Sequence, residues 1–225
     1  MKLLIESIFD IIDNVDAKPK LSEDEIKDAI KNFLKNNCNI LGQIKIQNKD
    51  KDDLYIVDVH GSVQYINKKR QDLTGGLFKF GEVSGTFNCA QCENLESLKG
   101  APRKCATFKC SGCTKLKNLE YAPDCINILC DKCKNLESLK GATQVCWTFN
   151  CSGCTKLKSL KGAPVKSVDF DCSNCTSLKN LDDAPDCKTF TCYNIGRKLK
   201  TNEVKKKVKA EEYHLTPSLK DVFGY

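Results

Sequence analysis

The sequence predicts an α+β protein built around a β-solenoid, with 20- or 21-residue coils and parallel strands, a small α/β cap in front and a helical cap behind. Two observations lead to this prediction. One pattern of Phe, Cys, Leu and Ala recurs from Phe87 to Cys192, and a fixed short period is typical of stacked repeats. The 225 residues are also 40% hydrophobic and 29% charged, which favours a folded chain over a disordered one.

Five near-identical units make up the array. They begin at Phe87, Phe108, Ile128, Phe149 and Phe170. Each continues with a C-x-x-C pair, two Leu three residues apart, and an Ala that usually precedes Pro. A sixth unit begins at Phe190, but the pattern fails at Ile195, which stands where the second Cys is expected.

The spacing within a unit predicts one short strand and an irregular return. Phe108 and Cys110 are two residues apart, so in a strand both side chains point to the same face. Cys113, Leu116 and Leu119 then recur every three residues, as a chain turning around a core requires. The Ala-Pro pairs mark a corner, because proline fixes φ and removes a donor. One coil cannot bury its apolar face alone, so the coils must stack.

The run C-x-x-F-x-C-x-x-C-x-x-L-x-x-L resembles the cysteine-containing form of the leucine-rich repeat. The segment FNCSGCTKLKSLKGAP is similar to repeat proteins of tailed phages, including crAss-like gut phages. This likeness covers roughly residues 42–210. The resemblance implies a right-handed, leucine-rich-repeat-like solenoid and a phage origin, and it implies no activity.

The flanks predict the two ends of the stack. Residues 21–37 form a predicted helix, with Ser22 as N-cap, Glu25 completing a capping box, and Leu21 and Ile26 able to form a hydrophobic staple. Short strands are expected between residues 43 and 87, with a degenerate coil beginning at Tyr65, 22 residues before Phe87. A polar helix is expected near residues 201–212. Met1–Ile12 is a second amphipathic candidate, which either contacts a partner or packs on the helix of residues 21–37.

Four segments follow from this reading. Residues 1–41 are the N-terminal helical segment or cap, and residues 42–85 are degenerate, strand-rich lead-in repeats. Residues 86–195 are the Cys- and Leu-rich solenoid, and residues 196–225 are a basic C-terminal cap.

The sixteen cysteines allow three interpretations. They can pack in the core, since a free thiol behaves as a small hydrophobe. They can bind zinc, for which C-x-x-C is a frequent half-site; the ligands would then be Cys110, Cys113, Cys130 and Cys133. They can form disulfides between coils, which needs an oxidising stage. Core packing is favoured, because every pair has the same place in its unit and would form parallel columns.

Two surface features are candidate partner contacts. Trp147 neighbours an inward Phe149 and is either an exposed anchor for a protein or a cover for a coil corner. Lysines recur on the strand and the return segments, at Lys109, Lys115, Lys156 and Lys158. They either form a basic edge for an acidic or phosphate-bearing partner or keep the array in solution.

The sequence therefore predicts a non-enzymatic, phage-encoded repeat protein that mediates protein–protein interaction, either virion-associated or binding a host factor. It needs no cofactor and no membrane, and its place is the host cytoplasm or the virion. A zinc-dependent nucleic-acid-binding protein is the alternative. No catalytic residues are expected, since His60 and His214 are the two histidines and lie on opposite sides of the repeats.

Overall fold

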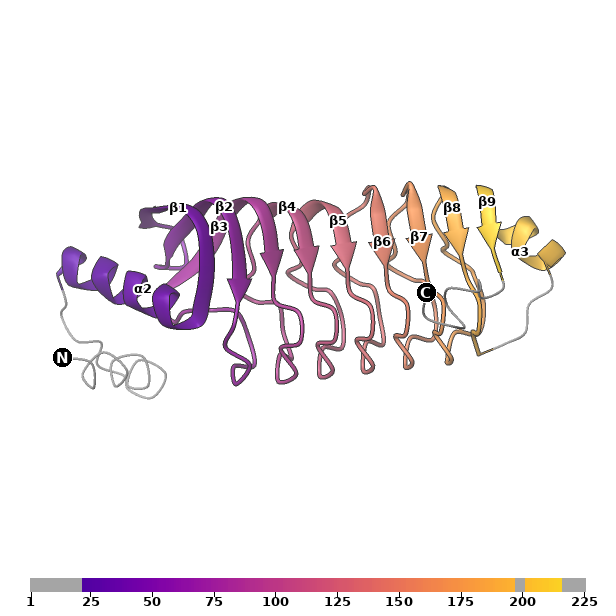
Figure 1. Cartoon of the computed structure of the whole chain (residues 1–225), viewed down its shortest axis with the longest axis horizontal. Coiled ribbons are helices and arrows are strands. Elements are labelled where there is room, and N and C mark those ends of the chain that lie inside the picture. The colour runs from indigo at the N-terminus through magenta and orange to yellow at the C-terminus, as the bar shows by residue number, and fades with distance from the viewer. Residues whose placement is uncertain (1–21, 197–200, 216–225) are drawn as a thin grey trace.

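The computed structural model describes residues 22–196 and 201–215. It is a β-solenoid in which nine strands form one continuous sheet, in the order of the sequence (Figure 1). The strands are β1 (Cys38–Lys49), β2 (Tyr55–Tyr65), β3 (Phe78–Asn88), β4 (Lys104–Lys109), β5 (Asp124–Leu129), β6 (Thr148–Asn150), β7 (Asp169–Asp171), β8 (Cys187–Thr191) and β9 (Ala210–His214). β1 runs antiparallel to β2, and every later neighbouring pair is parallel. The predicted solenoid with parallel strands is confirmed.

Helix α2 (Glu23–Asn37) precedes the sheet. It begins at the predicted capping box: Ser22 Oγ accepts from the Glu25 amide at 3.3 Å, and the Ser22 amide donates to the Glu25 carboxylate at 2.8 Å. Its apolar stripe is buried at Ala29, Ile30, Phe33 and Leu34. Leu21 of the predicted staple and the Met1–Ile12 helix lie outside the described residues.

The interior is a set of columns, one for each apolar position of the repeat. The Phe, both Cys of the C-x-x-C pair and both Leu of the described coils are almost completely buried. Rings of successive coils stack, as in Phe149–Phe170 with centroids 5.5 Å apart and Phe170–Phe190 at 5.8 Å. The stacked columns explain why the same residue types recur at the same spacing.

The turn between the two Cys of each pair needs a left-handed residue. The position before the second Cys has positive φ in every coil, at Gln91, Gly112, Lys132, Gly153, Asn174 and Asn194. The last of these precedes Ile195, which packs against the core. The sixth unit therefore keeps its turn, although an isoleucine replaces the cysteine.

Two details of the lead-in and the tail differ from the prediction. The residue that pairs with Phe87 is Val63, two residues before the predicted Tyr65. Helix α3 spans only Thr201–Lys207, and the end of the predicted helix instead lies in strand β9 (Ala210–His214), which pairs in parallel with β8. The tail therefore adds one more strand to the sheet. The segment boundaries expected after residues 41 and 85 lie inside β1 and β3.

Candidate functional site

The site is a corner of the coil, just before the buried Phe column. In the β6 coil, Cys146 and Phe149 are both buried, and the two residues between them lie on the outside. In a regular strand, side chains alternate between the two faces, and one of these two would point inward. The chain must therefore bend here. The bend leaves Trp147 facing solvent, with 68% of its surface exposed.

The backbone holds this corner in register from coil to coil. The Trp147 amide donates to the Ile126 carbonyl at 2.7 Å, and the Val168 amide donates to the Trp147 carbonyl at 2.9 Å. Neighbouring strands lie about 4.8 Å apart, so the three side chains form one row. Val145 and Val165 lie on the same corner segments and are 61% and 60% exposed. We call Ile126, Val145, Trp147, Val165 and Val168 the corner patch.

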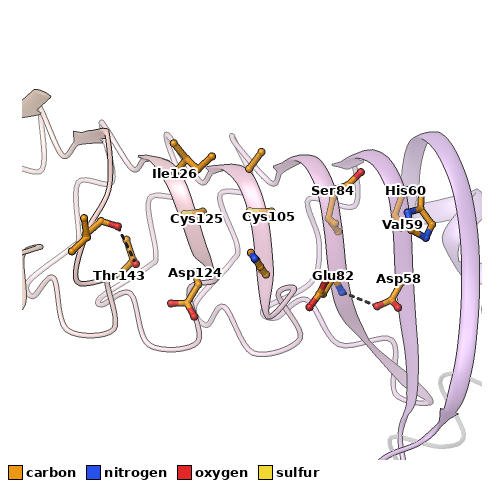
Figure 2. A pocket seen from close by; sticks show the side chains of 14 residues that line it. Asp58, Val59, His60, Glu82, Ser84, Cys105, Asp124, Cys125, Ile126 and Thr143 are labelled. Atoms are coloured by element: carbon orange, nitrogen blue, oxygen red, sulfur yellow. Dashed lines mark hydrogen bonds between the residues drawn. The ribbon is translucent and has the colours of Figure 1, made fainter. Parts of the chain in front are cut away.

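A groove of about 550 Å³ continues from the patch toward β2. Figure 2 shows His60, Ser84 and Ile126 on one side of it and Asp58, Glu82 and Asp124 on the other. Cys105 and Cys125 lie between the two rows. Val145 belongs to both the groove and the corner patch, so the two form one continuous surface.

Some of the acidic side chains in the groove already have partners. Asp58 Oδ1 accepts from the Glu82 amide at 2.8 Å, and Arg103 Nη2 pairs with Glu82 Oε1 at 2.5 Å. Within the described part of the chain, neither Asp124 nor Lys166 has an ion-pair partner, and both are exposed. These two charges, on either side of Val145, remain available for an outside contact.

A larger depression of about 1320 Å³ shares Asp58, Glu82 and Asp124 with the groove. Among its other charges, Lys79 contacts both Asp50 and Asp52, and Arg103 pairs with the shared Glu82. Most of the charged groups in the depression are therefore already paired.

The four candidate zinc ligands lie in the interior. Cys110, Cys113, Cys130 and Cys133 have no exposed surface. Cys113 Sγ donates to the Cys89 carbonyl at 3.2 Å, and Cys133 Sγ donates to the Cys110 carbonyl at 3.1 Å. Across residues 22–196 and 201–215, no three His, Cys, Asp or Glu side chains converge to hold a metal ion. All sixteen cysteines are free thiols.

Burial opposes the ionisation of several of these thiols. A side-chain hydrogen bond between the Cys110 and Cys133 thiols, together with burial, holds the pKa of Cys110 well above its usual range. Burial raises the pKa of Cys146 and of Cys187 to about 11. A nucleophilic or metal-binding cysteine must be a thiolate, so Cys110, Cys146 and Cys187 as placed are suited to packing.

The predicted lysine contacts come after the buried Phe of their coils, whereas Trp147 comes two residues before Phe149. Lys109 is half-buried on β4, while Lys115, Lys156 and Lys158 lie in the loops that follow the strands. Lys115 Nζ is 3.9 Å from Glu96 Oε1. The Glu137 amide donates to the Lys117 carbonyl, so a glutamate of one coil lies beside a lysine of the preceding coil. The loops therefore carry mixed charge.

Sequence reasoning singled out Trp147 but missed the rest of the corner patch. Ile126 and Val168 occupy the Trp147 position of the neighbouring coils, two residues before the buried Phe or Ile. Comparing this one position across the units would have found them. Asp124 and Lys166 could have been found in the same way, four residues before the Phe or Ile.

Comparison of the chain with protein-family models, curated proteins and solved structures finds no match. Among the described helices, none combines the length and apolar character needed to cross a bilayer.

Proposed function

We propose that this chain is a non-enzymatic repeat protein that binds another protein through the corner patch. The observation that carries the proposal is the exposure of five apolar side chains in one region, from 38% at Val168 to 68% at Trp147. Clustered apolar surface of this kind is typical of interaction sites, whereas scattered exposed residues are ordinary.

The backbone beneath the patch supports a binding role. Hydrogen bonds between coils fix the backbone of Ile126, Trp147 and Val168. The chain therefore loses little conformational freedom when a partner docks. Trp147 is the single tryptophan of the chain. Tryptophan is enriched among the residues that dominate binding energy, and it is the expected anchor.

The finer features of the fold belong to the same proposal. The coils are of the leucine-rich-repeat-like kind, α2 covers the front of the stack, and α3 covers the back. The resemblance to phage repeat proteins supports a phage origin, a partner in the phage particle or among host proteins, and a place in the host cytoplasm or the virion.

A zinc-dependent nucleic-acid-binding function has weaker support. The groove beside the patch carries Asp58, Glu82 and Asp124 against one lysine, Lys104, and carboxylates repel a phosphate backbone. Arg103, the arginine of the repeats, is paired with Glu82. The acidic groove therefore favours a protein partner.

A displayed library of random peptides of about 12 residues tests the proposal. Clones that bind the wild-type protein are selected, and their affinities are measured for wild type, Trp147→Ala and the loop control Lys156→Ala. We expect Trp147→Ala to weaken binding by about tenfold or more and Lys156→Ala to leave it unchanged. Equal binding by Trp147→Ala, or no enriched clone, would contradict the proposal.

A further inference from the structure

A row of alternating charge runs beside the corner patch. Its members each lie one residue before the buried position that Cys105, Cys125 and Cys146 occupy. In coil order the row is Glu82, Lys104, Asp124, Val145, Lys166, Asp186 and Lys209. We call it the charged row.

Strand pairing fixes this order. Glu82 pairs with Lys104 and Lys104 with Asp124, while Val145 bridges to Lys166 and Lys166 to Asp186. The pairing of Asn127 with Thr148 aligns the β5 coil with the β6 coil and sets Asp124 beside Val145. Lys209 Nζ lies 3.5 Å from Asp186 Oδ2 and ends the row.

The signs of the charged row invert when its order is reversed. From β3 to β9 they read minus, plus, minus, neutral, plus, minus, plus, with Val145 at the centre. A twofold rotation about a line along β6 would therefore place every charge opposite its counter-charge. Asp124 would face Lys166 of the second copy, and Lys104 would face Asp186 of the second copy.

The same rotation matches the apolar side chains. Ile126 and Val168 lie one coil to either side of Trp147, so each would meet the other across the axis. Trp147 and Val145 would meet their own counterparts at the centre. An apolar centre with a charged margin is the usual composition of an interface, and a twofold interface requires such self-complementarity.

We infer that the corner patch and the charged row bind the same surface of a second copy of this chain, with the two solenoids antiparallel. This inference rests on the proposed function and names the partner of that site. Figure 1 shows strands β4 to β9 side by side with little change of direction. The charged row is therefore straight enough to face the same row of a second copy that runs in the opposite direction. Asp124 and Lys166 lie about 10 Å apart, two strand spacings.

The alternating charges have a simpler explanation within one chain, and the experiment must distinguish it from pairing between two copies. Neighbouring opposite charges attract within one chain, as the Lys209–Asp186 pair does. Reversing both Asp124 and Lys166 separates the two explanations. Within one chain, the double change sets like charges beside Lys104 and beside Asp186. Between antiparallel copies, it restores an opposite pair.

Sedimentation velocity from about 1 to 200 µM, a range that covers weak interfaces, tests the inference. We expect a concentration-dependent dimer for wild type. Asp124→Lys and Lys166→Asp should each weaken it about tenfold or more, since like charges would then face each other. The double variant Asp124→Lys/Lys166→Asp should recover most of the affinity. Lys156→Asp, in a loop away from the row, is the matched control and should have no effect.

The fluorescence of Trp147 provides a second readout, because it is the only tryptophan. Its emission should shift to shorter wavelength as the dimer forms. A wild-type monomer at every concentration would overturn the inference, as would a double variant weaker than either single one. Either result would leave the peptide selection with Trp147→Ala as the separate test of the proposed function.

Discussion

The thiol of Cys133 donates a hydrogen bond to the carbonyl oxygen of Cys110 in the preceding coil, with the sulfur 3.1 Å from the oxygen. The bond recurs from Cys154 to Cys130 at 3.3 Å and from Cys175 to Cys151 at 3.2 Å. The second cysteine of each pair thus links two coils through the interior. It fills space and also provides a donor to a buried carbonyl.

Replacing this donor should destabilise the protein. We expect Cys133→Ala to lower the free energy of unfolding by about 1–3 kcal/mol, from the lost bond and the space left behind. Urea unfolding measures the effect. Cys187→Ala is the control, since Cys187 is only half-buried. A Cys133 variant that loses no more stability than the Cys187 variant would contradict this role.

Ser167 should be a site where a substitution stabilises the fold. It takes the place that Cys146 and Cys187 hold in the neighbouring coils, and its buried Oγ has no hydrogen-bond partner. Because an unsatisfied buried hydroxyl is costly, Ser167→Cys should add about 1 kcal/mol. Thermal unfolding of the two proteins gives the comparison, and a lower midpoint for the variant would show that the hydroxyl is satisfied in solution.

Adjacent residues on the return segment should differ sharply in their effect. Leu157 is completely buried and Lys156 is exposed. We expect Leu157→Ala to cost about 2–5 kcal/mol, because it leaves a cavity between stacked coils. Lys156→Ala should stay within about 0.5 kcal/mol. Similar costs for both, measured by urea unfolding, would mean that inside and outside are wrongly assigned.

Alkaline pH should weaken the fold. Burial raises the pKa of Cys146 and Cys187 to about 11 and that of Cys38 to about 12, from an ordinary value of 9.0. Above pH 9 the unfolded chain loses these protons while the folded chain keeps them, so stability falls as the pH rises. The urea midpoint should therefore be level below pH 8 and fall between pH 9 and 11. A midpoint that holds constant through pH 11 would argue against buried thiols.

Metal removal should leave the fold unchanged. The thiols at Cys110, Cys113, Cys130 and Cys133 are buried among coils, and two of them donate to carbonyls. Dialysis against a chelator should not alter the thermal midpoint, whereas a protein held by zinc unfolds when the metal is lost. Stoichiometric zinc in the purified protein, with unfolding on its removal, would restore the zinc interpretation.

The sequence predicted the coils well because one residue pattern is repeated. Position by position, the recurring Phe, Cys and Leu identify the interior, and Ser22 with Glu25 identifies the start of α2. The prediction was wrong where no repeat guided it. The segment after Lys207 has helical composition, yet Ala210–His214 forms β9 because the exposed edge of β8 offers a template for pairing.

The candidate site was predicted only in part, for a different reason. Trp147 can be recognised as a candidate contact from the sequence alone. The part that Val145 and Lys166 play in the surface depends on the residues that stacking places beside them. These neighbours are about 20 residues away in the chain, so their relation is visible only after the register is known. The charged row is a property of the stack rather than of any single coil.

Each strand of the solenoid pairs only with the strand before it and the strand after it, in the order β1 to β9. A chain pulled from its two ends would therefore unspool from the termini, one winding at a time, instead of rupturing at once. Each repeat buries one Phe or Ile, two Cys and two Leu, so the molecule would yield in many small and nearly equal steps of force. The solenoid would thus absorb mechanical work gradually. The middle windings, which carry Trp147, would unfold last.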